Sequence, residues 1–341
     1  MEKLLLSIIC GAVVLACNTG PELPDTSIMT PVLALERLPV IFDTDANNEL
    51  DDQHALAYLL FNGDIFDVRG ITVNATFNGG NIQEQYAEAD RVMKLCRVDG
   101  IPLYRGADSS FDEIKATLDQ SNFDGHVAVD FIIEEARTTR DQTLVLLPVG
   151  KLTNIALALM KAPDIKSKVR IVWLGSNYPE PGEYNQINDI PSLNYILEQE
   201  VPFEMVMVRY GKPSGSDMVR VTPQEIRKKM TGAGPTTPPV EGRHGDTFTN
   251  FGDYSVDLFD HVDLHGDPPS RALFDMVAVA ILKNSSWGRI TEIEAPILQG
   301  QEWEERPENT RKISIWENFK AAEILDDFYE TMSEPVLATR H

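Results

Sequence analysis

Positive charge and cysteine are both scarce in this chain. Its 341 residues include 30 lysines and arginines against 53 aspartates and glutamates, a formal net charge of -23. A field of this sign repels phosphate backbones and anionic headgroups, so we expect no nucleic-acid partner. It favours metal cations and neutral or cationic ligands instead. The apolar fraction of 43% can supply a sizeable core, and regular apolar segments argue against disorder.

A hydrophobic run long enough to span a bilayer comfortably is missing from the N-terminus. The run from Leu4 to Ala16 is shorter, and it ends in Val14-Leu15-Ala16-Cys17. Small residues before a cysteine resemble the lipobox of bacterial lipoproteins, in which the cysteine is acylated. We therefore expect residues 1–16 to be a lipoprotein signal peptide, and residues 17–37 to be the lipidated Cys17 with a tether. The alternative is an ordinary signal peptide with an incidental cysteine.

This N-terminus predicts a location in the bacterial cell envelope, on the periplasmic side or in the outer membrane. Membrane contact is then expected through the lipid anchor only. Cys10 would leave with the signal peptide, so Cys96 would remain without a disulfide partner inside the chain. Its apolar neighbours indicate a helix that buries it, with a reactive thiol as the alternative.

Apolar runs of strand length alternate with helical patterns along the rest of the chain. The expected strands are Val40–Phe42, Val68–Val73, Ile101–Tyr104, Leu144–Val149, Val169–Leu174, Phe203–Val208, Ile290–Leu298 and Lys312–Trp316. The expected helices are Ala55–Phe61, Gln83–Arg97, Val127–Arg137, Asn154–Lys161, Ser192–Glu200, Arg271–Leu282 and Phe319–Met332. The alternation predicts an α/β fold, an open and mostly parallel sheet with helices on both faces and a Rossmann-like core. We expect one domain over residues 38–341, in which residues 231–269 form an active-site loop or cap.

Acidic side chains crowd the first strand-to-helix connection. Asp43, Asp45, Asp51 and Asp52 lie within ten residues, at the carboxyl end of a strand where such sheets bind ligands. Buried elements on both sides would force the carboxylates together, and this is costly unless a cation or protons neutralise them. Oxygen ligands favour Ca²⁺ or Mg²⁺, and the run contains no histidine or cysteine for zinc. A solvated acidic face is the alternative.

A longer segment that begins with this run, Asp43-Thr44-Asp45…Asp51-Asp52-Gln53-His54-Ala55-Leu56, resembles the opening signature of the inosine–uridine-preferring nucleoside hydrolases. Further blocks resemble this family in the same order along the chain. They are Gly70–Val73 leading to Asn78, Tyr104–Ala107, Val149–Ala156, Trp173–Gly175 followed by Asn177, Glu183 and Asn185, and Leu273–Ala278. The resemblance extends from Val40 to Leu282.

The resemblance implies calcium-dependent hydrolysis of the N-glycosidic bond of a ribonucleoside, or a related N-ribosyl compound, to free base and ribose. The implied metal ligands are Asp45, Asp52, Asp275 and the backbone carbonyl of Thr153. The implied sugar ligands are Asp51, Asn78, Asn177, Glu183 and Asn185. Asp45 would be the general base for a metal-activated water, with Asn78 beside it in the catalytic set. A homodimer or homotetramer is the expected assembly.

Each auxiliary residue also has a plainer structural interpretation. Asn177 and Asn185 are typical of turns, and Glu183 could be an exposed side chain. Thr153 could cap a helix, and Asp275 could be an acidic residue at a helix N-terminus.

Two departures from the family pattern concern the site directly. Asn47–Leu50 makes the acidic run two residues longer than usual, and Phe274 stands where many members have a histidine before the last metal aspartate. The leaving-group acid is therefore sought elsewhere. The candidates are His244, His261 and His265, with Tyr254 behind them, and Phe77, Tyr184, Phe248 and Phe251 could stack on a base. Base specificity stays open.

Two other classes of function remain open. A sugar- or nucleoside-binding lipoprotein without catalysis would explain Phe274 and the longer acidic run. A phosphatase of the haloacid-dehalogenase type would also place Asp43-Thr44-Asp45 after a strand, although the glycine turn usual after its aspartates is absent.

Overall fold

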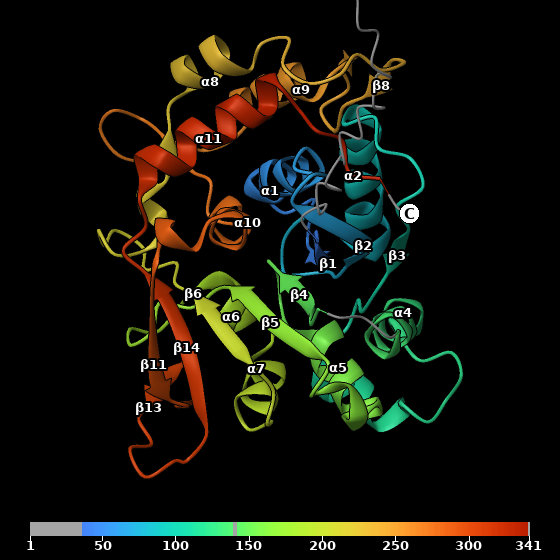
Figure 1. Ribbon diagram of the computed structural model, residues 1–341, viewed down its shortest axis with the longest axis vertical. Helices are drawn as coiled ribbons and strands as arrows, with labels where there is room; N and C mark the ends of the chain where they lie inside the picture. The colour runs from blue at the N-terminus through green and yellow to red at the C-terminus, as the bar shows by residue number, and fades with distance from the viewer. Residues whose placement is uncertain (1–35, 139–141, 340–341) are drawn as a thin grey trace, which may run out of the picture. The chain divides into compact units, whose positions relative to one another are not determined.

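The computed structural model describes residues 36–138 and 142–339 (Figure 1). The expected signal peptide, Cys17 and nearly all of the tether lie outside these described residues. None of the helices in the described part is long and apolar enough to cross a membrane.

An eight-stranded sheet forms the centre of the domain, with the order β11-β14-β6-β5-β4-β1-β2-β3. The strands are β1 Leu38–Thr44, β2 Phe66–Val73, β3 Leu103–Arg105, β4 Leu144–Pro148, β5 Val169–Leu174, β6 Phe203–Val206, β11 Arg289–Glu294 and β14 Lys312–Glu317. All neighbouring pairs are parallel except β11 and β14. The prediction of an open, mostly parallel sheet is confirmed.

Helices cover both faces of this sheet, as Figure 1 shows. Residues of α1 (Asp51–Leu60), α2 (Ile82–Leu95), α8 (Pro223–Met230), α10 (Met276–Lys283) and α11 (Ala321–Ser333) join one hydrophobic cluster. Residues of α3 (Phe111–Ile114), α4 (His126–Arg137), α5 (Thr153–Lys161) and α7 (Ile190–Leu197) join the other. Successive strand residues point to opposite faces, so Val40 and Phe42 enter the first cluster and Ile41 the second. This explains why β1 reads as a continuous apolar run.

Residues 231–269 contain more regular structure than the sequence indicates. A short hairpin of β8 (Val240–Glu241) and β9 (Thr247–Phe248) is followed by the helix α9 (Phe251–Asp260). Phe251, Tyr254 and Leu258 of α9 are buried, at the i, i+3, i+7 spacing of an amphipathic helix. Intervening glycine and aspartate obscured that period in the sequence.

The expected helix over Arg271–Leu282 is in fact two elements. β10 (Arg271–Ala272) pairs with β7 (Arg220–Val221), and α10 begins only at Met276. The pairing partner lies far away in sequence, so local periodicity could not reveal it. The remaining short elements are α6 (Tyr184–Asn188), β12 (Ile297–Gln299), β13 (Glu302–Glu304) and the 3-10 turns Lys115–Thr117, Pro163–Ile165, Ser216–Met218 and Ser285–Trp287.

The carboxyl ends of β1, β4, β5 and β6 lie beside one another, because these strands are parallel neighbours. The segments that follow them begin with Asp45, Val149, Gly175 and Met207. Ligand sites of open α/β sheets form at such an edge.

Candidate active site

A cavity of about 390 Å³ opens at the carboxyl ends of these strands. Its acidic wall is formed by Asp45, Asp51, Asp52, Glu183 and Asp275. Its other lining residues are Asn48, Glu49, Val149, Leu174, Tyr184, Asn185, Val208, Tyr210, Asp217, Arg220, His265, Arg271, Ala272 and Phe274. The carboxylates come from segments up to 230 residues apart, so the fold has brought them together.

The acidic run is placed by the end of β1 and the start of α1. Asp45 follows the last strand residue, Thr44, and Asp51 and Asp52 are the first two residues of α1. The Thr44 hydroxyl donates to Asp52 at 2.5 Å, which ties the strand end to the helix start. Oxygen atoms of Asp51, Asp52 and Asp275 all lie within 4.8 Å of one another, and the three residues are buried.

Burial and mutual repulsion make these carboxylates hard to ionise together. Burial raises the pKa of Asp45 and of Asp51 to about 7, and the charge of Glu183 adds to both rises. Burial, followed by the charges of neighbouring aspartates, raises the pKa of Asp52 and of Asp275 well above the usual range. A divalent cation among these oxygens would replace the repulsion with attraction. The donor set therefore fits a hard metal ion that prefers oxygen ligands.

Asp43 belongs to the scaffold below the cavity. Its carboxylate accepts hydrogen bonds from Thr72 at 2.5 Å, Asn74 at 2.8 Å and Asn154 at 2.7 Å. Burial raises its pKa to about 6, and the three hydrogen bonds oppose that rise. These bonds join β1, the end of β2 and α5. Asn74, which the sequence analysis missed, could have been found as the residue directly after β2.

Gly150 lets the chain pass close to Asp45. A Cβ atom at this position would lie 2.5 Å from Asp45 Oδ1 and 3.0 Å from both side-chain polar atoms of Asn74. A side chain there would displace one of them, so the turn after β4 depends on glycine. The preceding residue, Val149, lines the cavity, and its carbonyl oxygen accepts a hydrogen bond from Asn185 Nδ2 at 2.6 Å.

Thr153 does not line this cavity. It is the first residue of α5, and its hydroxyl donates to Asp189. Carbonyl groups of a helix point along the axis toward its C-terminus, away from the strand ends. Of these two residues, Val149 lines the cavity beside the carboxylates and Thr153 does not.

The expected sugar ligands divide into two groups. Asp51, Glu183 and Asn185 line the cavity, whereas Asn177 and Asn78 do not. Glu183 also caps α6, accepting from the backbone N–H groups of Asn185 at 3.0 Å and Gln186 at 2.8 Å.

Asn177 and Asn78 each form a hydrogen bond with a residue that lines the cavity. Asn177 Oδ1 accepts from the Tyr210 backbone at 3.1 Å and so holds a cavity residue in place. Asn78 is exposed, and its backbone N–H donates to the Tyr184 hydroxyl at 3.0 Å.

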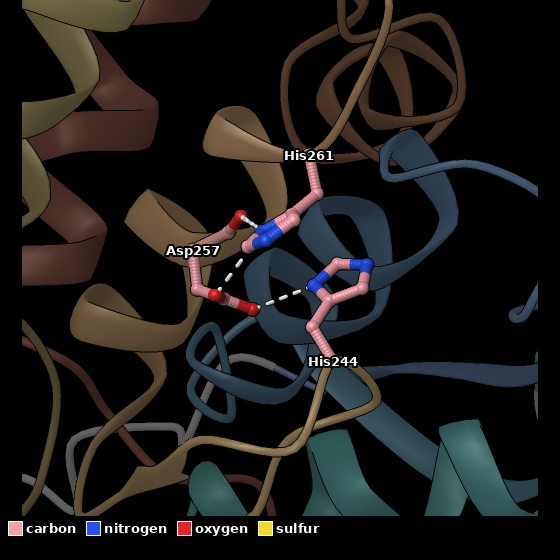
Figure 2. Close-up of side chains that lie close together, drawn as sticks. All are labelled: His244, Asp257 and His261. Atoms are coloured by element: carbon pink, nitrogen blue, oxygen red, sulfur yellow. Dashed lines mark hydrogen bonds and ion pairs between the residues drawn. The ribbon is translucent and has the colours of Figure 1, made fainter.

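The three candidate histidines are also separated by the fold. His265 lines the cavity, whereas His244 and His261 meet at Asp257 in a second cluster, shown in Figure 2. Tyr254 is fully buried, and its hydroxyl donates to Glu88 at 2.5 Å.

Aromatic rings form a further part of the wall. Tyr210 and Phe274 meet edge to face, with ring centroids 5.7 Å apart. Tyr184 also lines the cavity, while Phe248 packs on Tyr254. Phe77 is 69% exposed and lies edge to face with Tyr184, with ring centroids 6.5 Å apart, whereas Phe251 is fully buried.

An ion pair that the sequence analysis did not anticipate crosses the cavity wall. Arg271 of β10 pairs with Glu49, one of the additional residues of the acidic run. Arg271 is 8% exposed, so burial lowers its pKa. Glu49 is therefore fixed by a partner far along the chain, and the longer run has a defined position.

Comparison with known proteins agrees with this architecture. A sequence model of the family described as inosine-uridine preferring nucleoside hydrolase matches residues 40–326. The inosine-uridine preferring nucleoside hydrolase of Crithidia fasciculata is 24% identical over 245 residues, which cover 65% of this chain and 70% of that protein. An uncharacterised protein of Schizosaccharomyces pombe is 27% identical over 194 residues, 50% of this chain and 60% of that protein.

Solved structures share the fold. A plant nucleoside hydrolase superimposes with a TM-score of 0.67 at 15% identity, over 88% of this chain and 100% of its own. The inosine-uridine preferring nucleoside hydrolase of Bacillus anthracis gives 0.63 at 16% identity, with the same coverage.

Proposed function

The chain belongs to the inosine-uridine preferring nucleoside hydrolase family of N-glycosyl hydrolases, and on that premise we propose that it uses calcium to hydrolyse a ribonucleoside. The products would be a free base and ribose. The observation that carries this proposal is the cluster of Asp51, Asp52 and Asp275, whose oxygens lie within 4.8 Å of one another beside Asp45 and Glu183.

Calcium fits the cluster better than other common metals. The proposed ligands are carboxylate oxygens together with the backbone carbonyl of the lining residue Val149, and Ca²⁺ accepts such irregular oxygen sets more readily than Mg²⁺. We propose Asp45, Asp52, Asp275 and the Val149 carbonyl as ligands. When bound, calcium supplies a positive charge that eases the deprotonation of water.

Asp45 is proposed as the general base. The Thr76 hydroxyl donates to Asp45 Oδ2 at 2.6 Å, which fixes the carboxylate and leaves Oδ1 beside Gly150. A carboxylate held in this way can take a proton from the attacking water. Its pKa in the metal-free protein, raised by burial to about 7, would fall beside a cation.

Asp51, Glu183 and Asn185 are proposed to bind the ribose hydroxyls. The Asn185 amide nitrogen donates to the carbonyls of Val149 and Leu174, at 2.6 and 3.2 Å, so its oxygen suits a sugar hydroxyl. Cleavage passes through an oxocarbenium-like state, which the negative charge of Asp51 and Glu183 would stabilise.

Of the candidate acids, His265 is proposed to protonate the leaving base, because it lines the cavity where His244 and His261 do not. The edge-to-face pair of Tyr210 and Phe274 offers an apolar surface on which a base could stack. A location in the bacterial cell envelope, with lipid on Cys17, is also proposed. Only the sequence of the N-terminus supports that part.

A nucleoside panel tests the proposal directly. The purified protein is incubated with purine and pyrimidine ribonucleosides, and free base and reducing sugar are followed by chromatography. We expect release that EDTA abolishes and added calcium restores. Asp45→Asn should still bind nucleoside without releasing base, whereas Asp90→Asn, in an exposed ion pair on α2, should behave like the wild type.

The opposite result would identify a binding protein. If calorimetry shows tight nucleoside binding while the wild type releases no base on prolonged incubation, the chain is a sugar or nucleoside receptor. Phosphate release from phosphomonoesters would instead support the phosphatase class.

A further inference from the structure

A second cluster of ligating side chains lies outside the cavity, between the β8–β9 hairpin and α9 (Figure 2). His244 comes from the hairpin turn, and Asp257 and His261 from α9 and its C-terminal cap. His244 Nδ1 lies 2.8 Å from Asp257 Oδ2, and His261 Nδ1 lies 3.2 Å from Asp257 Oδ1. One ligand atom from each residue falls within a mutual distance of 4.8 Å.

Each imidazole nitrogen lies at nearly the separation of two ligands of a tetrahedral metal ion from the nearer carboxylate oxygen. Ligand atoms of a tetrahedral zinc site are roughly 3.3 Å apart, given bond lengths of about 2.0 Å. Asp257 and His261 are four residues apart on a helix, so their side chains share one face. The two imidazole rings stack with centroids 4.0 Å apart, and both turn Nδ1 toward the carboxylate.

Burial and ligand chemistry distinguish this cluster from the acidic one. Asp257 is 7% exposed, and both of its carboxylate oxygens face imidazole nitrogens. The side chains of His244 and His261 are 22% and 47% exposed, which leaves an open side for water as a fourth ligand. Two imidazoles and one carboxylate suit zinc, whereas calcium prefers oxygen alone.

We propose that His244, Asp257 and His261 bind a zinc ion through the two Nδ1 atoms and the carboxylate. The metal would connect the hairpin turn to α9, two segments that the hydrogen bond between His244 and Asp257 joins at this point. In the metal-free protein His261 Nδ1 also contacts the Asp257 carbonyl oxygen at 2.8 Å. Zinc bound to His261 Nδ1 would replace this contact with the carbonyl oxygen.

The neighbouring Arg243 connects this cluster to the acidic run. Arg243 Nη1 donates to the carbonyl oxygens of Glu49 at 2.8 Å and Asn47 at 3.4 Å, within the longer acidic run. Arg243 Nε donates to His244 Nε2 at 3.3 Å. Zinc on Nδ1 places the proton of His244 on Nε2, so the hydrogen bond from Arg243 Nε would be lost. The bonds from Arg243 Nη1 to the acidic run do not involve His244 and would remain. Zinc would thus fix the turn that supports one wall of the cavity.

Cobalt spectroscopy tests the site without relying on activity. The untagged protein is saturated with calcium, to fill the carboxylate cluster, and then titrated with Co²⁺. We expect one equivalent to give the intense visible absorption of four-coordinate cobalt, and Zn²⁺ to displace it. His261→Gln and His244→Gln should each weaken binding by more than about 100-fold, because even outer-shell changes cost 10- to 100-fold.

His126→Gln is the matched control. His126 Nδ1 contacts the Phe123 carbonyl at 2.9 Å, much as His261 contacts the Asp257 carbonyl, but it belongs to α4 and has no place in the cluster. It should bind cobalt like the wild type. Thermal unfolding should show stabilisation by zinc that both cluster variants lose. Absence of four-coordinate cobalt in the wild type, or an unchanged spectrum in both variants, would show a hydrogen-bonded cluster and no metal site.

Discussion

At the scale of single residues, Gly150 shows how little space surrounds the proposed base. A methyl group at this position would meet Asp45 Oδ1 at 2.5 Å. We expect Gly150→Ala to lower kcat for ribonucleosides by about 100-fold, because a displacement near 1 Å can cost that much. Gly288→Ala is the control, since its Cβ would meet Trp316 and Phe319 at 3.1 to 3.2 Å, outside the cavity lining. Equal losses in both variants would contradict a positioning role.

If His265 protonates the leaving base, the effect of replacing it should depend on whether the leaving group needs a proton. We expect His265→Gln to slow the hydrolysis of purine nucleosides by about 100-fold, the lower range for general acid catalysis. A p-nitrophenyl riboside, whose leaving group needs no proton, should be cleaved at nearly the wild-type rate. The ratio of the two kcat/KM values is the measurement. An equal loss on both substrates would mean that His265 positions the sugar and does not protonate the base.

The sequence could reveal those site residues that directly follow or begin a regular element. Asp45, Asp51 and Asp52 are of this kind, because an apolar strand and helix mark their positions. The pairing of Arg271 with Glu49 could not be found in this way, since it depends on contact between residues far apart in sequence. Thr153 shows a related limit: the sequence locates the segment after β4 but not which of its residues lines the cavity.

At the scale of elements, β1 and α1 are coupled through the hydrogen bond from Thr44 to Asp52. We expect Thr44→Val to weaken calcium binding by roughly 10- to 100-fold, the usual effect of removing a partner of a metal ligand. Thr72→Val is matched in residue type and burial, but its hydroxyl donates to Asp43. It should reduce stability by about 1 to 3 kcal/mol and leave calcium affinity nearly unchanged. Calorimetry with calcium distinguishes the two variants, and similar affinities would contradict the proposed coupling.

The sequence predicts the bounds of a helix or strand correctly where its buried residues form a nearly uninterrupted apolar run. β5 has the predicted bounds, Val169–Leu174, because all of its residues except Arg170 are apolar and buried. α9 was missed because polar residues interrupt its buried stripe. The local pattern at β10 is helical, and its strand conformation depends on a tertiary contact, the pairing with β7. Local patterns thus predicted the central sheet, whereas a long-range contact determined the structure at β10.

At the scale of the whole molecule, the chain carries a net charge of -23, and buried carboxylates line its cavity. In the metal-free protein the pKa values of Asp45 and Asp51 rise to about 7, from about 4 in an unfolded chain. The folded state therefore holds more protons than the unfolded state in this range. Its stability falls as pH rises from about 4 to 7, and the loss is complete above the folded pKa.

Calcium should reverse this loss, because it binds the ionised carboxylates of the folded state. At 100 times its Kd we expect about 2.7 kcal/mol of stabilisation at pH 8, or roughly 4 °C in Tm for a domain of about 300 residues. At pH 5 protons compete with the metal, so the gain should be much smaller. Thermal unfolding with calcium and with EDTA at both pH values gives the comparison.

The difference in Tm between the calcium and EDTA samples reports on the aspartates of the cavity, because the effects of other titrating groups cancel. Burial lowers the pKa of His54 to about 4, so its protonation reduces stability as pH falls from about 6.5. His54 binds Ser255 and the Leu50 carbonyl, away from the cavity lining, so this loss should be nearly the same with and without calcium. A calcium gain that is equal at pH 5 and pH 8 would show that the metal does not bind the buried aspartates. A gain confined to high pH follows only if calcium and protons share the same oxygens.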